Sequence, residues 1–269
     1  MPYAATYPDR CYDDFYLTRA SDVPALYQRL DPVVHGPVDG NHVFTPEDAK
    51  TFEENGFLVY QSLFDDHEIA AWQAELNRLC HAYRGTAYPE VVTERDTGEV
   101  RSIFAIHEFS DAFSELARDR RLAGLAKAIL CDDVYLHQSR INYKPGFGGR
   151  EFAWHSDFET WHAEDGMPRM RAVSMSLMLT DNHAFNGPLM LIPGSHMTFV
   201  SCVGATPDDH YKTSLQRQEF GVPDRETLSR MVDQHGIEMP TGKAGMLLVF
   251  DCNTIHGSNG NITPYPRSN

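Results

Sequence analysis

The sequence predicts a mainly β protein with flanking helices, arranged as a double-stranded β-helix of the jelly-roll type. Apolar residues recur at helical spacing in the first half of the chain. From Val134 onward the pattern changes to short apolar or alternating runs separated by Gly, Pro, Asn and Asp, which is typical of antiparallel sandwiches and barrels. With 269 residues, the chain has the length of a barrel or sandwich that folds as one unit. We therefore expect a single domain over residues 1–269.

This domain is expected to contain three regions. Residues 1–43 are rich in Tyr, Asp and Pro without sustained periodicity, which predicts an irregular arm that wraps over the body. Residues 44–130 should form a mainly helical support, and residues 131–269 the jelly-roll core. Because the mouth of a jelly roll is a natural binding site for a small molecule, we look for function in the third region.

The first helix has a clear start. Thr45-Pro46-Glu47-Asp48 combines a capping Thr, Pro at the first helical position and acidic residues in the first turn, and Gly56 ends the helix. The other predicted elements are a strand at Phe57–Tyr60, a helix from Asp65 or Asp66 to about His81 with Trp72 in its core face, a third helical region over about Ser110–Leu130, and strands at Val134–Tyr143, Glu151–Asp157, Arg171–Thr180, Pro188–Ile192 and Met246–Asp251.

The composition excludes several classes of protein. A formal charge of −15 disfavours nucleic acid or an anionic membrane as a partner, because both would repel such a surface. The sequence contains neither an apolar run of transmembrane length nor a signal-peptide pattern, so we expect a cytoplasmic protein. Its five cysteines, which lack a Cys-x-x-Cys pair, are expected to be reduced thiols: Cys11, Cys80, Cys131, Cys202 and Cys252.

The most informative motif is Trp154-His155-Ser156-Asp157, followed by His256 and then Arg267. On an extended strand, side chains at positions i and i+2 lie on the same face, so His155 and Asp157 could bind one metal ion. A distant histidine would complete the arrangement of two histidines and one carboxylate found in non-haem Fe(II) oxygenases. The spacing alone is weak, because a chain with 13 histidines contains such pairs by chance, and His162-Ala163-Glu164 repeats it.

A buried cation in addition to the metal ligands would support an oxygenase that uses 2-oxoglutarate. The keto-acid end of this cosubstrate chelates iron, and its distal carboxylate favours a fixed cation that can bind both oxygens. Arg267 follows His256 by eleven residues and is a candidate for that cation. The alternative for an arginine in a Pro-Arg-Ser turn is a solvated surface charge. The accompanying metal motif favours the functional interpretation.

Longer stretches around this motif resemble a known family. They are FAWHSDFETWHAEDGMP at Phe152–Pro168, QSRINYKPGF at Gln138–Phe147, NGPLMLIPGSH at Asn186–His196, FVSCVG at Phe199–Gly204, and DCNTIHGSNGNITPYPRSN at Asp251–Asn269. Together they resemble the ectoine hydroxylases of the phytanoyl-CoA dioxygenase superfamily, in order over roughly residues 45–269. A likeness of this length is much more specific than His-x-Asp, and it favours His155 and Asp157 over His162 and Glu164.

The resemblance implies an enzyme that hydroxylates ectoine to 5-hydroxyectoine with Fe(II), O₂ and 2-oxoglutarate, releasing succinate and CO₂. It also implies a possible homodimer. The implied iron ligands are His155, Asp157 and His256; the implied 2-oxoglutarate contacts are Lys144 and Arg267, helped by Asn142 and Ser258; the implied ectoine contacts are Gln138, Thr160 and Trp161. An indole face attracts a delocalised cation such as the ectoine amidinium, although Trp161 could equally be a core residue.

The sequence departs from the family at a few places. It stops at Asn269, where the family continues into another strand, so we expect the jelly roll to lack its carboxy-terminal end. Ala153 and Gly148 stand where bulkier or basic residues are expected.

Three other functions stay open. A related oxygenase could act on another small amino acid or acyl substrate, because one iron site serves many substrates. A jelly-roll protein could also bind a small molecule without catalysis, which the intact motif disfavours. A halogenase would carry a small residue in place of Asp157, so the carboxylate argues against that activity.

Overall fold

The computed structural model describes residues 14–38, 43–94, 97–204 and 220–269. The beginning of the predicted arm, with Cys11, and residues 39–42 lie outside this part of the chain. The helices are α1 (Pro46–Asn55), α2 (Asp66–Tyr83), α3 (Ile106–Phe109), α4 (Asp111–Ala117), α5 (Arg120–Leu130), α6 (Asp157–Glu164), the 3₁₀ turn η1 (Ser195–Met197) and α7 (Arg225–His235). Within these described ranges, no helix has the length and apolar character needed to cross a bilayer.

The strands form small antiparallel sheets. They are β1 (Leu26–Gln28), β2 (Phe57–Tyr60), β3 (Val91–Thr93), β4 (Val100–Phe104), β5 (Arg140–Lys144), β6 (Phe152–His155), β7 (Val173–Leu177), β8 (Leu189–Leu191), β9 (Thr198–Val200), β10 (Leu247–Asp251), β11 (His256–Ser258) and β12 (Arg267–Ser268). The sheet orders are β2-β10-β7, β6-β11-β8, β12-β5-β4-β3 and β1-β9.

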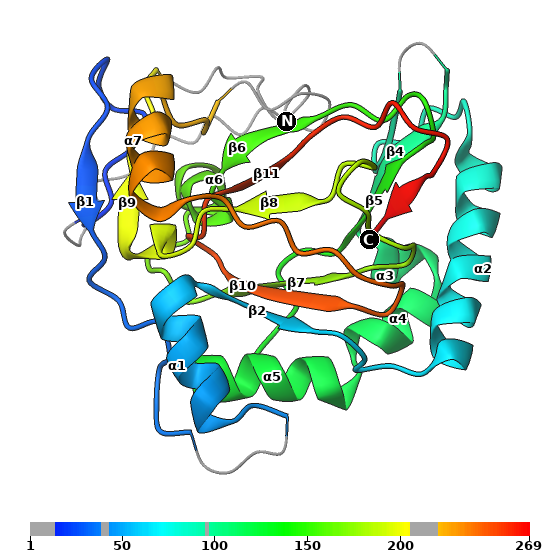
Figure 1. The fold of residues 1–269 in the computed structure, drawn as a ribbon, viewed down its shortest axis with the longest axis horizontal. Helices are drawn as coiled ribbons and strands as arrows, with labels where there is room; N and C mark the ends of the chain where they lie inside the picture. Colours follow the sequence, from blue (N-terminus) through cyan, green and yellow to red (C-terminus); the bar gives the residue numbers. More distant parts are fainter. Residues whose placement is uncertain (1–13, 39–42, 95–96, 205–219) are drawn as a thin grey trace, which may run out of the picture.

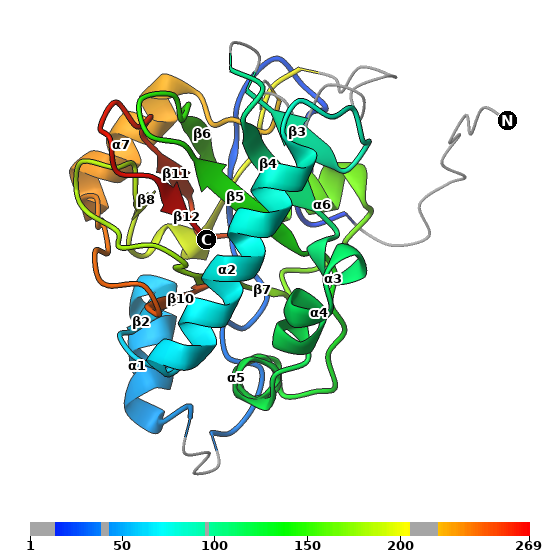
Figure 2. The same ribbon diagram turned by 90° about the vertical axis from the view of Figure 1, so that its right-hand side faces the viewer.

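Two of these sheets face each other as the double-stranded β-helix. Figure 1 shows β6, β11 and β8 above β2, β10 and β7, with α1 and α5 below the second sheet. In Figure 2, α2 runs diagonally over the helical side, with α4 and α5 next to it. The predicted fold class, mainly β with flanking helices, is therefore confirmed.

Strand β10 explains how the layers are held together. Its residues alternate between two buried faces, so the strand is a continuous apolar run rather than an alternation of apolar and polar residues. Leu247 and Val249 pack against the helices, in a cluster that includes Trp72 of α2. Leu248 and Phe250 point into the space between the two sheets. The central strand thus joins the helical support to the interior that holds the site.

The helix starts predicted from the sequence are confirmed. Thr45 caps α1 and forms a reciprocal capping box with Asp48, and Gly56 ends the helix in the left-handed conformation, with φ of 81°. Asp65 caps α2 through the backbone amides of His67 and Glu68. Both features depend on neighbouring residues alone, which is why the sequence shows them.

The third helical region is helical as predicted, and it consists of two helices, α4 and α5. The chain breaks between α4 and α5, because Asp119 leaves helical geometry (φ −58°, ψ 130°) and its side chain accepts a hydrogen bond from the Arg121 amide. Asp119 therefore caps a new helix. The apolar spacing continues across the break and conceals it.

Several predicted strands were too long. The predicted strand Val134–Tyr143 begins only at Arg140, the one at Arg171–Thr180 is limited to Val173–Leu177, and the one at Glu151–Asp157 ends at His155. Periodicity marks where apolar residues lie, but the ends of a strand depend on where its neighbour stops pairing. The hairpin of β3 and β4 and the helices α3, α6 and α7 were not predicted.

The arm wraps over the body as expected and is not wholly irregular. Its residues Leu26–Gln28 pair with β9 as the short strand β1. Arg29 is buried and forms an ion pair with Asp251 at the end of β10, with 2.7 Å between nitrogen and oxygen. Tyr16 is fully buried, and its hydroxyl donates to Asp31 at 2.8 Å. The described part of the arm is therefore packed into the structure.

Candidate metal centre and its cavity

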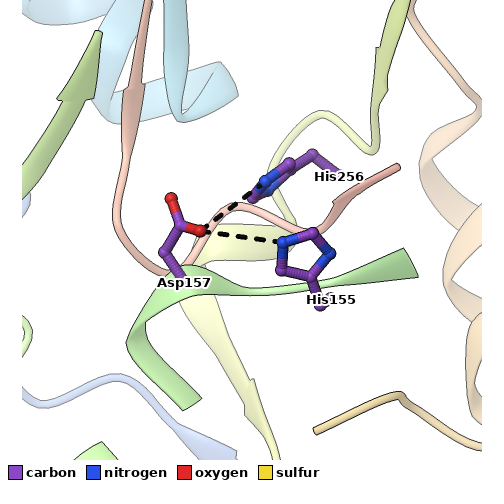
Figure 3. A group of neighbouring side chains, drawn as sticks. All are labelled: His155, Asp157 and His256. Carbon is purple, nitrogen blue, oxygen red and sulfur yellow. Dashed lines mark ion pairs between the residues drawn. The ribbon is translucent and has the colours of Figure 1, made fainter. Parts of the chain in front are cut away.

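Three elements bring the candidate metal ligands together. His155 ends β6 and His256 begins β11, and the two residues are direct partners in the antiparallel pairing of these strands. The chain then turns at Ser156, whose side chain caps α6, so Asp157 is the first residue of that helix. The expectation that His155 and Asp157 share a strand face was wrong. The turn into α6 nevertheless brings Asp157 back toward the histidines (Figure 3).

The three side chains surround one small volume. The Nε2 atoms of His155 and His256 lie 3.7 Å and 3.8 Å from Asp157 Oδ1. One possible ligand atom from each residue lies within 4.8 Å of the others. All three side chains are buried. This is a suitable arrangement for one ion held by three protein ligands, with further coordination positions open.

Hydrogen bonds leave the correct atoms free for a metal. His155 Nδ1 lies 2.7 Å from the Ala153 carbonyl oxygen, and His256 Nδ1 lies 2.9 Å from that of Thr254. Because a carbonyl only accepts, each Nδ1 carries the proton and each Nε2 keeps its lone pair. Ser174 donates to Asp157 Oδ2 at 2.7 Å, which leaves Oδ1 toward the histidines. Hydrogen bonds of this kind orient metal ligands.

The electrostatics favour the same protonation states. Burial, reinforced by the neighbouring His256, lowers the pKa of His155 to about 3. Burial alone would raise the pKa of Asp157, but His256, His155 and Arg140 together hold it below its usual value. A neutral imidazole and an ionised carboxylate are the forms that bind metal ions.

The competing pair His162 and Glu164 does not converge. Both residues lie on α6, where positions i and i+2 point in different directions. His162 contacts Asp14 and the Met167 carbonyl oxygen, at 3.1 Å and 2.7 Å. Glu164 instead pairs with Arg19, with 2.7 Å between Oε1 and Nη1. In the described part of the chain, the only group of three side chains that could hold a metal ion consists of His155, Asp157 and His256.

Two buried cations lie beside each other, and one of them contacts Ser258, the last residue of the strand that begins with His256. Lys144 of β5 and Arg267 of β12 are direct partners in their antiparallel pairing, and their exposed fractions are 1% and 2%. Lys144 Nζ donates to Ser258 Oγ at 2.8 Å and to the Asn259 carbonyl oxygen. Arg267 Nε and Nη2 are buried without a hydrogen-bond partner. Among the described residues, no carboxylate contacts either cation.

Burying these two charged side chains without an anion lowers the stability of the folded protein. Burial, followed by the positive charges of Arg267 and Arg101, lowers the pKa of Lys144 to about 7. Burial lowers the pKa of Arg267 to about 10. An uncompensated buried guanidinium is rare, because removing a charge from water costs several kcal/mol. The orphaned nitrogens thus fit an anionic ligand such as a carboxylate.

A cavity of about 900 Å³ opens onto the metal centre. Asp157 and His256 contribute to its wall, and so do three residues expected to bind ligands: Gln138, Asn142 and Trp161. Lys144, Ser258 and Arg267, which were also expected to bind ligands, are not part of this wall, and neither is Thr160. Its hydroxyl is buried without a hydrogen-bond partner, on the side of α6 that Gly221 approaches.

The sequence interpretation missed Arg140. This residue begins β5, contributes to the cavity wall, and is close enough to lower the pKa of Asp157 and His155. Within the described residues, its guanidinium has neither a hydrogen bond nor an ion pair. A signal was available, because Arg140 lies two residues from both Gln138 and Asn142, and alternate residues of a strand share a face.

Comparisons with known proteins agree with this geometry. The model of the phytanoyl-CoA dioxygenase (PhyH) family matches residues 52–269. This chain belongs to that family. It is similar to the ectoine dioxygenase of Sphingopyxis alaskensis, with 52% identity over 256 residues, 95% of this chain and 84% of the relative. The ectoine dioxygenase of Halomonas elongata is 54% identical over 261 residues, 95% of this chain and 77% of the relative.

Solved structures extend the comparison. The crystal structure of EctD from S. alaskensis with 2-oxoglutarate and 5-hydroxyectoine has a TM-score of 0.86 and 46% identity, covering 95% of this chain and 84% of the other. The carbocyclase SnoK of nogalamycin biosynthesis has a TM-score of 0.62 and 18% identity, covering 87% of this chain and 84% of the other. The second likeness shows a shared fold alone.

The first prediction concerns metal binding. His155→Ala, Asp157→Ala and His256→Ala should each remove most bound Fe(II), because each change deletes one of three ligands while the hydrophobic core lies elsewhere. Metal content after anaerobic loading measures this, with circular dichroism as the check on folding. His162→Ala is the matched control and should keep its metal. Full metal content in all three variants would place the centre elsewhere.

Proposed function

We propose that this protein is an Fe(II)- and 2-oxoglutarate-dependent dioxygenase that hydroxylates ectoine to 5-hydroxyectoine. The reaction consumes 2-oxoglutarate and O₂ and releases succinate and CO₂, so one oxygen atom enters each organic product. The observation that carries this proposal is the buried triad of His155, Asp157 and His256, together with two buried cations that no carboxylate among the described residues contacts. The strong similarity to ectoine dioxygenases over 95% of the chain supports the choice of substrate.

The proposed iron ligands are the triad residues. Bound iron supplies activation of O₂ coupled to oxidative decarboxylation of the cosubstrate. The protein holds His155 Nε2, His256 Nε2 and Asp157 Oδ1 ready for the ion through the hydrogen bonds of Ala153, Thr254 and Ser174. Because the lowered pKa values of His155 and Asp157 favour a neutral imidazole and an ionised carboxylate, these two ligands need little rearrangement of protons to bind the ion.

Lys144 and Arg267 are the proposed site for the distal carboxylate of 2-oxoglutarate. A carboxylate there would satisfy the orphaned nitrogens of Arg267 and offset one of the two buried positive charges. Ser258 fixes the Lys144 ammonium at 2.8 Å. Asn142 accepts a hydrogen bond from Ser102 at 3.0 Å, which turns its amide NH₂ group away from Ser102 and leaves it free to donate in the cavity.

Ectoine is a small zwitterion with a carboxylate and a delocalised amidinium, and the cavity wall offers a partner for each. Arg140 is the proposed partner of the carboxylate, because its guanidinium has no anion among the described residues. Trp161 offers an aromatic face to the amidinium, and Gln138 offers an amide to the polar ring edge. Thr160 would need a rotation or movement of α6 to join them, so its role stays a prediction.

The cellular setting and assembly of the protein are also proposals. We propose a cytoplasmic location, because the acidic composition suits the interior of a salt-tolerant cell. The family resemblance supports a homodimer. Cell fractionation and light scattering test these two expectations.

The overall proposal is tested by assaying the Fe(II)-loaded protein with 2-oxoglutarate, O₂ and ectoine. Succinate and hydroxylated product should form together in equal amounts. Succinate without 5-hydroxyectoine would retain the dioxygenase class and reject the substrate. Much faster turnover of another small substrate would support the related-oxygenase alternative.

The second prediction concerns Arg267. Arg267→Ala should weaken 2-oxoglutarate binding by about 2–5 kcal/mol, because it removes one partner of a buried charge pair. Binding is measured by titration calorimetry with a redox-inert divalent metal in the site, and metal affinity should change little. Arg267→Lys should restore only part of the affinity, because an ammonium lacks the planar pair of donors. Unchanged binding in Arg267→Ala would contradict this role.

The third prediction concerns pH. Lys144 has a pKa lowered to about 7, so its charged form dominates below that value and the neutral form above it. Affinity for dianionic 2-oxoglutarate should therefore fall as pH rises above about 7, by up to roughly tenfold per pH unit. Lys144→Met should bind more weakly at low pH and lose this slope. If the wild-type protein and Lys144→Met show the same dependence of affinity on pH, another titrating group causes it.

The fourth prediction concerns substrate binding. Arg140→Met should raise the KM for ectoine by roughly tenfold or more, because a hydrogen bond to a charged group contributes about 1.5–3 kcal/mol. Trp161→Ala should also impair hydroxylation, while both variants keep iron and 2-oxoglutarate. Steady-state kinetics with separate measurement of succinate and product checks this. A wild-type KM for ectoine in Arg140→Met would show that the ectoine carboxylate binds elsewhere.

A further inference from the structure

Helix α6 carries two parts of the site on only eight residues, Asp157–Glu164. Asp157 is its first residue and faces the histidines, and Trp161 in its second turn faces the cavity. A shift of this helix would therefore move a metal ligand and a cavity wall together. Since helices this short are marginal alone, contacts with other segments must set the position of α6.

The N-terminal arm supplies the strongest of these contacts. Glu159 of α6 is a carboxylate with an exposed fraction of 1%. Arg19 of the arm binds both of its oxygens, with Nε at 2.9 Å from Oε1 and Nη2 at 2.8 Å from Oε2. Thr18 donates to the same carboxylate at 2.7 Å. The other end of the guanidinium binds Glu164, at 2.7 Å.

Arg19 is itself held firmly. Its backbone lies in the left-handed region, with φ of 53°, which a residue other than glycine adopts only when its surroundings enforce it. Its amide donates to the Cys202 carbonyl oxygen at 2.9 Å, and the Cys202 amide donates to Thr18 Oγ1 at 3.0 Å. This part of the arm is therefore anchored to the segment that follows β9.

A third segment encloses the ion pair. Gly221 lies so close that a Cβ atom there would be 2.4 Å from Glu159 Oε2 and 2.8 Å from Arg19 Nη2. With φ of 72°, this position also favours glycine through its backbone. The pair is therefore covered on the side facing Gly221, where water cannot replace either partner.

The arm also contacts the rest of the outer side of α6. The Tyr16 ring meets the Phe158 ring edge-on, with 5.3 Å between centroids, and Asp14 lies 3.1 Å from His162 Nε2. The α6 residues that form hydrogen bonds, ion pairs or ring contacts with the arm (Phe158, Glu159, His162 and Glu164) do not contribute to the cavity wall, to which Asp157 and Trp161 do contribute. One side of α6 therefore faces the metal centre and the cavity, and another side contacts the N-terminal arm.

We propose that Arg19 is a positioning residue for the reaction, which fixes α6 so that Asp157 and Trp161 keep their places relative to each other. The arm thereby becomes part of the catalytic apparatus without touching the substrate. The inference rests on the proposed function for its kinetic test. Loss of the Arg19 contacts should let α6 shift, and a displacement of about 1 Å can cost roughly a hundredfold in rate.

The experiment compares Arg19→Met with Arg121→Met. Arg121 is a matched control, because it also binds two acidic side chains, Asp119 and Glu68, but it joins α5 to α2 on the helical side. Both variants are studied at a temperature where circular dichroism shows them folded. The measurements are the ratio of 5-hydroxyectoine to succinate, the KM for ectoine, and amide hydrogen exchange of residues 156–165 in the metal-free protein.

A positioning role predicts that Arg19→Met produces succinate without matching product, raises the KM for ectoine, and lowers the turnover number by roughly tenfold to a hundredfold. Its α6 amides should exchange faster, whereas Arg121→Met keeps the wild-type ratio and the wild-type exchange of α6. Arg19→Lys should recover part of each property, because it keeps the charge and loses the paired donors.

Two results would overturn the proposal. One is a wild-type product ratio and wild-type α6 exchange in Arg19→Met, which would leave the arm with a role in stability alone. The other result applies if Arg19→Met does not fold, in which case Glu159→Gln and Arg19→Lys are tested in its place. Both variants should then form succinate in excess of 5-hydroxyectoine and show faster amide exchange in α6. Wild-type behaviour in both would reject the positioning role of Arg19. Failure of the wild-type protein to hydroxylate ectoine would instead reject the proposed function, and the exchange measurement would still test the role of Arg19.

Discussion

The direct pairing of β6 with β11 is the constraint on which the site depends. It places His155 opposite His256, so that two imidazoles from distant parts of the sequence meet at 4.3 Å between ring centroids. Because side chains alternate along a strand, a slip of one residue in this register would send one histidine to the opposite face of the sheet. Everything that packs the two facing sheets, above all the apolar strand β10, therefore preserves the separation of the histidines.

The second organising feature is charge that the protein does not neutralise by itself. Lys144 and Arg267 are buried, Arg140 contributes to the cavity wall, and the described residues supply none of the three with a carboxylate in contact. Elsewhere the protein pairs its buried cations: Arg19 with Glu159, and Arg29 with Asp251. This contrast is the physical basis for proposing that the unpaired cations bind an anionic ligand, because the fold pairs buried cations internally elsewhere.

The sequence predicted the parts that depend on neighbouring residues or on long apolar patterns. The caps at Thr45 and Asp65 and the apolar strand β10 are of this kind, and the long motif around His155 indicated the fold class. Sequence patterns did not reveal where tertiary contacts end an element. Asp157 begins a helix because Ser156 caps it, and Thr160 turns away from the cavity with that helix. Arg140 was missed because a lone arginine carries no motif, although its alternation with Gln138 and Asn142 was a sequence signal and its unpaired guanidinium is a structural one.

The orientation of the two histidines has a consequence for how this site can change over time. Each imidazole is fixed by the backbone carbonyl two positions earlier, that of Ala153 or Thr254, and not by a side chain. The side chain at position 153 can therefore vary without turning the ring, whereas the buried Thr254 hydroxyl donates to the Gly56 carbonyl oxygen at 2.9 Å and is constrained by that contact. A small residue at 153 is compatible with an intact centre for this reason. Substitutions can thus change the side chains around the histidines while main-chain hydrogen bonds keep the orientation of both rings.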